Sequence, residues 1–189
     1  METIKQFKHK LIKNFLTKEE VELCKNYAII NHRLEDNPQM DIQGTDSSHY
    51  ADTLTESLLL SKKQKMEECV GLKLLPTYSY YRVYTFGGVL KKHTDRHSCE
   101  VSVTIHIDSS GEEWPIFIEG SKYNLNPGDA VVYLGQDLKH WRETFTGDYH
   151  IQAFLHYVDF HGSNTMFYKD MRDFWGERVA ERLERYYKK

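Results

Sequence analysis

The stretch "LLPTYSYYRVYTFGGVLKKHTD", residues 74–95, is where the pattern of the chain changes from helical to extended. Its aromatic and β-branched residues alternate with a period of two, which is typical of a β-strand. Successive side chains of a strand point to opposite faces, so every second residue shares a face. One such face carries Tyr78, Tyr80, Arg82 and Tyr84. Gly87 and Gly88 then mark a turn, and the chain reaches a His-x-Asp triplet at residues 93–95.

The residues before this strand predict two helices joined by a loop. Residues 17–33 place apolar side chains at helical spacing, and Thr17 with Glu20 forms a capping box at their start. Residues 34–52 are polar and contain Pro and Gly, so we expect a loop there. A second helix is expected around residues 53–70.

The residues after the strand predict more sheet and then a helix. Short extended segments are "EVSVTIHID" (100–108), "PIFIEG" (115–120), "AVVYL" (130–134) and "HIQAFLHYVD" (150–159). In the first of them, one face holds Val101, Val103, Ile105 and Ile107, and the other holds Glu100, Ser102, Thr104 and His106. That polar face either meets solvent or lines a cavity. Residues 164–189 read as mainly helical, so the order of elements predicts an α+β protein whose β part is a barrel or sandwich.

Composition bounds the function of the chain. Its 189 residues suffice for one domain with a single core. A formal net charge of −3 and the absence of a basic block argue against a nucleic-acid binder. No apolar run is long enough to span a membrane, and the first residues lack the pattern of a signal peptide, so we expect a cytoplasmic protein. Three scattered cysteines without a C-x-x-C pair predict free thiols. The oligomeric state stays open.

Two His-x-Asp triplets, at residues 93–95 and 106–108, are candidate halves of a metal site. On a strand, residues i and i+2 point the same way, so one segment supplies an imidazole and a carboxylate. His140, just beyond the strand "AVVYL", is the expected third ligand. Two imidazoles and one carboxylate on one face of iron(II) leave three positions open. Those positions suit a bidentate 2-oxo acid and dioxygen.

Three segments resemble the core of the 2-oxoglutarate- and iron(II)-dependent oxygenase superfamily, in particular its compact prolyl-4-hydroxylase-like members. They are "YRVYTFGGVLKKHTD" (81–95), "NPGDAVVYLGQDLKHWRE" (126–143) and "QAFLHYVD" (152–159). The segment "IKNFLTKEEVELC" (12–24) is similar to the helix that precedes this core in such enzymes.

The resemblance implies one domain, residues 1–189, with a double-stranded β-helix core of the jelly-roll or cupin-like type. Residues 1–72 would form the N-terminal helices that support the core, residues 73–159 the core itself, and residues 160–189 a C-terminal helical extension.

The resemblance also chooses between the two triplets. In the family, the His-x-Asp follows a tyrosine-bearing strand and a glycine turn, as residues 93–95 do here. It therefore implies that His93, Asp95 and His140 bind Fe(II), and that His106 lines the cavity instead.

The residue that anchors the far carboxylate of 2-oxoglutarate is not fixed by the resemblance. Family members often place Arg or Lys about nine or ten residues after the distal His, and this chain has Tyr149 and His150 there. His150, if protonated, is one candidate anchor. Arg82 and Arg142 are two others, because a guanidinium pairs bidentately with a carboxylate.

Further contacts to the co-substrate are implied at three positions. Tyr84 corresponds to a tyrosine that contacts the co-substrate in prolyl-hydroxylase-like enzymes. Ser102 and Thr104 are expected to hydrogen-bond the 2-oxo acid or to orient His93.

The function implied is that of a dioxygenase using Fe(II), 2-oxoglutarate and O2, which hydroxylates a small-molecule or peptide substrate and releases succinate and CO2. Prolyl hydroxylation is the leading subtype. Asp95 favours hydroxylation, because halogenating relatives replace that carboxylate by a small residue. Two alternatives stay open: a non-catalytic cupin-like ligand-binding module, and a metalloenzyme of another class. Residues 36–52 and 160–175 are candidate lids over the cavity.

Overall fold

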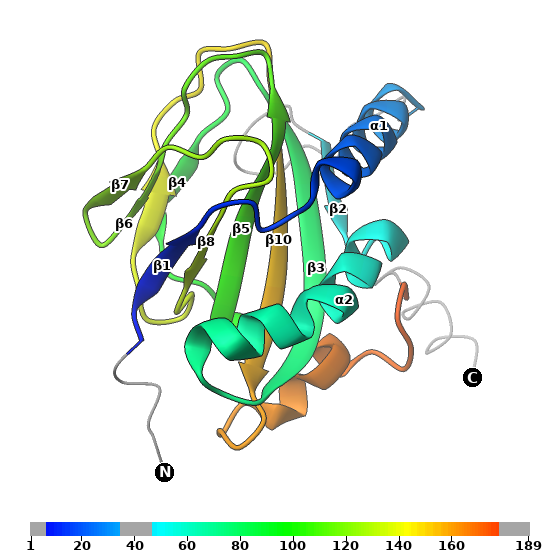
Figure 1. Cartoon of the computed structure of the whole chain (residues 1–189), viewed down its shortest axis with the longest axis vertical. Helices are drawn as coiled ribbons and strands as arrows, with labels where there is room; N and C mark the ends of the chain where they lie inside the picture. Colours follow the sequence, from blue (N-terminus) through cyan, green and yellow to red (C-terminus); the bar gives the residue numbers. More distant parts are fainter. Residues whose placement is uncertain (1–6, 35–46, 178–189) are drawn as a thin grey trace.

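Two antiparallel sheets form the body of the protein in a computed structural model that describes residues 7–34 and 47–177 (Figure 1). The large sheet has the order β1-β8-β5-β10-β3-β2, with bounds His9–Ile12, Ala130–Tyr133, Val101–Ser109, Tyr149–Asp159, Leu74–Thr85 and Ser47–Tyr50. The small sheet has the order β4-β9-β6-β7, with bounds Leu90–His93, His140–Arg142, Ile116–Ile118 and Ser121–Tyr123. The expectation of an α+β protein with a two-sheet β part is confirmed.

Two helices cover the large sheet on the side away from β4, β6 and β7 (Figure 1). Helix α1, Lys18–Leu34, begins at the predicted capping box. The amide of Thr17 donates to the carboxylate of Glu20 at 2.9 Å, and the amide of Glu20 donates to the Thr17 hydroxyl at 3.2 Å. Helix α2, Thr53–Val70, follows, and both predicted helices are confirmed. Neither helix of the described residues is long and apolar enough to cross a membrane.

The two faces of β5 have different surroundings, as its alternating sequence predicts. Its apolar residues Val101, Val103, Ile105 and Ile107 are all within 1% of complete burial and belong to the main core with α1 and α2. The polar residues Ser102, Thr104 and His106 are buried as well. Of the two options for this polar face, the structure shows the one in which it lines the protein interior.

Strand β2 lies where a loop was expected. Residues 47–50 pair with β3 at the edge of the large sheet, and the His49 ring stacks on Tyr81 at a centroid distance of 4.2 Å. This edge pairing depends on the neighbouring strand, so the polar local sequence did not reveal it. Residues 35–46, which hold most of the first candidate lid, lie outside the described residues.

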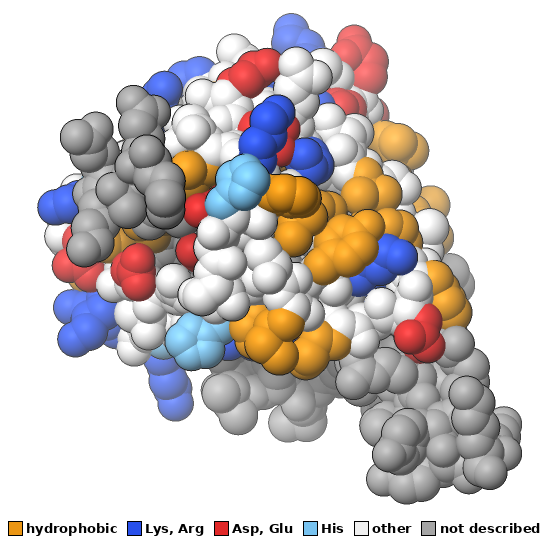
Figure 2. Space-filling model, turned by 90° about the horizontal axis from the view of Figure 1, so that it is seen from below, with side chains coloured by type: hydrophobic (Ala, Val, Ile, Leu, Met, Phe, Trp, Pro, Cys, Tyr) orange, Lys and Arg blue, Asp and Glu red, His pale blue; other side chains and the backbone are white. Residues whose placement is uncertain are grey.

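The C-terminal segment departs from the predicted helix within its described part. Residues 165–171 form short 3-10 turns, η3, which are broken where Lys169, Asp170 and Met171 adopt positive φ angles of 54°, 53° and 59°. Arg172, the next residue, is buried and its guanidinium donates to Glu56. Residues 178–189 lie outside the described residues. The segment exposes several apolar side chains: Met166, Tyr168, Met171 and Phe174. Hydrophobic side chains are visible at the surface in the view from below (Figure 2).

The ion pair between Arg172 and Glu56 ties this segment to α2. Both side chains are buried, Arg172 also donates to the Thr77 carbonyl at 3.1 Å, and Glu56 accepts from the Gly176 amide. The pair thus satisfies groups from three separate parts of the chain.

Replacing Glu56 by Ala leaves the Arg172 guanidinium buried without its anion. We expect the free energy of unfolding in urea to fall by about 3–5 kcal/mol. Lys63→Ala, which removes a partly exposed ion pair with Glu67, is the control and costs about 1 kcal/mol or less. Equal losses in the two variants would contradict a structural role for the buried pair.

Candidate metal centre and neighbouring cavities

Strand pairing brings the first and third predicted ligands together. His93 ends β4, His140 begins β9, and the two residues are partners in the register of the small sheet. Their ring centroids lie 4.3 Å apart. Asp95 follows β4 directly, and its amide donates to the Gly135 carbonyl at 2.8 Å, which holds the carboxylate beside the two rings.

The distances within this group suit a metal ion. Asp95 Oδ1 lies 3.4 Å from His93 Nε2 and 3.5 Å from His140 Nε2. Metal bonds of about 2.1 Å at right angles separate neighbouring ligand atoms by about 3.0 Å. The two distances from Asp95 are close to this value, and all three ligand atoms lie within 4.8 Å of one another.

The hydrogen bonds of the two imidazoles select the tautomer that binds a metal. His93 Nδ1 lies 2.7 Å from the Lys91 carbonyl, and His140 Nδ1 lies 2.9 Å from the Leu138 carbonyl. A carbonyl only accepts, so each Nδ1 carries a hydrogen. Nε2, which faces Asp95 in each ring, is then the nitrogen that a metal would take in place of a proton. Second hydrogen bonds of this kind orient metal-bound histidines in proteins. The residues present therefore fit a metal ion.

Electrostatics keep the third ligand ionised. Burial alone would raise the pKa of Asp95, but the hydrogen bonds from His140 and His93 outweigh burial and hold the pKa well below its usual range. Donation to the Asp95 carboxylate in turn raises the pKa of His93. Ser102 donates to Asp95 Oδ2 at 3.3 Å and lies 2.9 Å from Nδ1 of His156. Ser102 thus supports the carboxylate.

A cavity of about 230 Å3 opens onto these ligands. Tyr78 and Tyr80 of the predicted β3 face line it, although neither was predicted to be a site residue. Three further lining residues were also not predicted to be site residues: Tyr133, Phe154 and His156. Arg82 and Tyr84 also belong to this cavity, with the Arg82 guanidinium 4.3 Å from the centre of the Tyr84 ring. The alternating pattern of β10 already put Phe154 and His156 on one face and was the available indication for those two.

Arg142 and His150 line a second cavity, of about 260 Å3, which we call the Arg142 cavity. His106 was expected in the cavity of the iron ligands but lines this second cavity instead, and its ring stacks on His150. Thr104 accepts a hydrogen bond from Gln152 at 2.6 Å, and the Gln152 oxygen lies 2.8 Å from His150 Nε2. The candidate anchors are therefore divided between two cavities.

The second triplet is held in other contacts. His106 Nδ1 lies 2.7 Å from the Leu125 carbonyl. Asp108 accepts from the Tyr149 hydroxyl at 2.8 Å and pairs with Lys25 at 3.1 Å. Neither residue belongs to a group of three potential metal ligands among the described residues.

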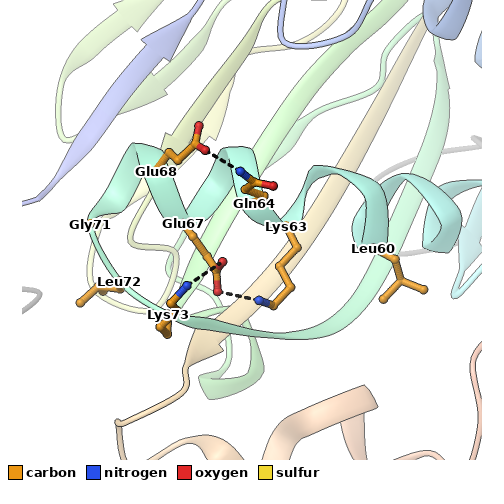
Figure 3. Close-up of a pocket in the computed structure, with 8 residues that line it drawn as sticks. All are labelled: Leu60, Lys63, Gln64, Glu67, Glu68, Gly71, Leu72 and Lys73. Carbon is orange, nitrogen blue, oxygen red and sulfur yellow. Dashed lines mark hydrogen bonds and ion pairs between the residues drawn. The ribbon is translucent and has the colours of Figure 1, made fainter.

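A third hollow, of about 650 Å3, lies at the end of α2 (Figure 3). Its charges pair with one another: Glu67 lies 2.6 Å from Lys63 and 3.8 Å from Lys73. Gln64 donates to Glu68 at 2.9 Å. No group of potential metal ligands falls in it within the described residues, and we assign it no function.

Comparison with solved structures gives the fold. A prolyl-4-hydroxylase from Pseudomonas putida aligns with a TM-score of 0.63 and 16% identity over 82% of this chain and 95% of that chain. The epimerase SnoN of nogalamycin biosynthesis, described as non-heme and α-ketoglutarate-dependent, aligns with a TM-score of 0.69 and 11% identity over 82% and 80%. HygX from Streptomyces hygroscopicus, with nickel and 2-oxoglutarate bound, aligns with a TM-score of 0.63 and 12% identity over 85% and 86%.

The chain has the fold of the 2-oxoglutarate- and iron(II)-dependent oxygenases. The resemblance read from the sequence is thus confirmed at the level of the fold. No protein-family model matches the sequence, and no curated protein matches it either. At identities this low, the oxygenase fold by itself leaves the reaction to be argued from the site.

Gly135 is the residue whose replacement tests the geometry of the metal group. A Cβ at this position would lie 2.5 Å from Asp95 Oδ2, 2.5 Å from the Cys99 carbonyl and 2.6 Å from Ser102 Oγ. Gly135→Ala must push the carboxylate away from the imidazoles. We expect the affinity for Mn(II), measured by calorimetry, to fall about 10- to 100-fold.

Gly162→Ala is the control for this substitution. The nearest atoms to the added Cβ all belong to Asp159 and lie 3.0 Å or more away. It should leave Mn(II) affinity unchanged. Denaturation curves of both variants separate loss of the site from loss of the fold. Unchanged Mn(II) affinity in a folded Gly135→Ala protein would refute the role assigned to Asp95.

Proposed function

We propose that this protein is an Fe(II)- and 2-oxoglutarate-dependent dioxygenase, in which His93, Asp95 and His140 hold the iron. One observation carries the proposal. The Nε2 atoms of two imidazoles lie close to the same carboxylate oxygen, and the Nδ1 of each ring is hydrogen-bonded to a backbone carbonyl. Iron(II), with a 2-oxo acid and O2, supplies the oxidation that releases succinate and CO2. Asp95 as the third ligand favours hydroxylation.

Arg142 is the residue that best fits the far carboxylate of 2-oxoglutarate. Its Nη1 donates to the Trp114 carbonyl, while Nε and Nη2 have no hydrogen-bond partner among the described residues. Nε–H and Nη2–H form the side of a guanidinium that binds a carboxylate bidentately. The side chain is fully buried, so an unpaired charge there is costly until an anion arrives.

The other candidate contacts take supporting roles in this proposal. Arg82 and Tyr84 line the iron side of the site, and the guanidinium of Arg82 packs on the Tyr84 ring. Ser102 orients Asp95. Thr104 belongs to the hydrogen-bonded row that continues through Gln152 to His150.

The substrate is proposed to be a side chain of a peptide or a small amino-acid-like molecule. The cavity beside the ligands has a volume of about 230 Å3, which suits one small group, and aromatic residues line it. Prolyl hydroxylation is supported by the likeness to the Pseudomonas putida enzyme and by the sequence resemblance. The same resemblance supports the finer fold assignment, a double-stranded β-helix within a single domain. A cupin-like module that only binds a ligand would need no such set of aligned metal ligands.

Anaerobic titration with Fe(II) and then 2-oxoglutarate tests the proposal. We expect a weak visible absorption band that requires both components, because the 2-oxo acid must chelate the bound iron. The band should be absent in His93→Ala and in His140→Ala. Admission of O2 to the wild-type complex should yield succinate.

His161→Ala is the matched control, because this exposed histidine lies outside the cavities, and it should keep the band. A wild-type protein that binds iron but gives neither band nor succinate would favour the non-catalytic module. Loss of the band in His161→Ala as well would point to general damage by histidine removal.

A further inference from the structure

Two buried imidazoles line the Arg142 cavity, and one nitrogen of each ring lacks a hydrogen-bond partner among the described residues. His106 Nε2 and His150 Nδ1 are buried and have no hydrogen-bond partner among the described residues. Their rings stack at a centroid distance of 4.5 Å with an angle of 9° between planes. Both residues are more than nine-tenths buried. Such unsatisfied groups beside an unsatisfied guanidinium indicate a place for a polar ligand.

Hydrogen bonding fixes which form each imidazole has before a ligand arrives. His106 Nδ1 must donate to the Leu125 carbonyl, so its Nε2 holds a lone pair. Gln152 uses its amide nitrogen on Thr104 and turns its oxygen to His150 Nε2. His150 Nε2 must therefore donate, and its Nδ1 holds a lone pair. The cavity thus offers the two N–H groups of Arg142 and two lone pairs.

If a carboxylate bound to Arg142, the lone pairs of its oxygens would face the lone pairs of the two imidazoles. Two acceptors repel unless a proton lies between them, so a neutral imidazole beside the bound anion is unfavourable. A protonated imidazole instead becomes a donor and an opposite charge. Only one of the two rings gains by this change, because two imidazolium rings stacked at 4.5 Å would repel each other.

The surroundings keep both rings neutral until then. Burial lowers the pKa of His150 well below its usual range, with Arg142 and His106 adding to the effect. Burial likewise lowers the pKa of His106. Burial also lowers the pKa of Arg142 to about 10, which still leaves the guanidinium charged at neutral pH.

Other groups around the pair do not supply a fixed cation. Tyr84 of β3 is the register partner of His150, and Trp114 and Phe145 contact its ring. The carboxylates that line the cavity are Asp108, Glu112 and Glu113. Asp108 pairs with Lys25, Glu112 accepts from Ser110 and Glu113 accepts from Asn124. Arg142 is thus the one cation of the cavity in the described part of the chain.

We propose that the far carboxylate of the 2-oxo acid binds between Arg142 and the stacked pair His106–His150, and that the pair takes up one proton as it binds. The proposal rests on the proposed function. The proton enters from solvent and stays on the imidazole pair while the carboxylate is bound. Because the complex holds one more proton than the free protein, affinity rises as pH falls, by at most about tenfold per pH unit.

Calorimetry counts this proton directly. The protein is saturated with Mn(II), and 2-oxoglutarate is titrated at pH 7.5 in buffers of different ionisation enthalpy. We expect uptake of between about one half and one proton for 2-oxoglutarate, and weaker binding at pH 8.5. Pyruvate, which has the same 2-oxo acid head but no far carboxylate, should bind without proton uptake.

His150→Arg is the sharpest variant, because it places a permanent cation where the proposal requires an induced one. It should bind 2-oxoglutarate with no proton uptake and with little dependence on pH. His161→Ala, outside the cavity, should retain the wild-type uptake.

The outcomes separate this inference from the proposed function. Binding of 2-oxoglutarate by the wild-type protein without proton uptake, or equal uptake with pyruvate, overturns the inference and leaves the oxygenase proposal standing. Failure of the Mn(II) protein to bind any 2-oxo acid overturns both. Retained uptake in His150→Arg would mean that a permanent cation beside the carboxylate does not replace the proton, and it would also overturn the inference.

Discussion

The pairing of β4 with β9 is the contact on which the candidate metal centre depends. His93 and His140 are far apart in the sequence, and the register of these two short strands makes them neighbours. The bond between the Asp95 amide and the Gly135 carbonyl then ties the carboxylate to the segment that leads into β9. A shift of one residue in this register would turn one imidazole to the opposite face of the sheet. The site therefore requires the small sheet to form in one register.

Features that depend on near neighbours in the sequence were predictable. The capping box of Thr17 and Glu20 forms because both bonds lie within one helical turn. The alternation in β5 predicts one apolar face and one polar face, and the structure shows both faces buried. The same rule placed His93 and Asp95 together. These predictions needed only the local geometry of the backbone.

Features that depend on distant contacts were not predictable in the same way. Strand β2 exists because β3 offers it an edge, and its own sequence is that of a loop. The turns after Asn164 stand where a helix was expected, and the segment that they begin is tied to the distant residue Glu56 through Arg172. Strand alternation put Arg82 and Tyr84 on one face of β3, but it did not assign Arg142 and His150 to one cavity and Arg82 to another. Cavities are properties of the packed sheets.

The large sheet resolves a conflict between stability and chemistry. An interior that holds Arg142, three histidines of β5 and β10, and several phenols gains little from the hydrophobic effect, because buried polar groups cost free energy unless they are paired. The opposite face of the same strands buries Val101, Val103 and Ile105 against α1 and α2, and it supplies that stability. Because the apolar face of each strand supplies the stability, the inner face can contain hydrogen-bond donors and acceptors that have no partner. The proposed ligand is therefore inferred from these unpaired groups more than from the fold.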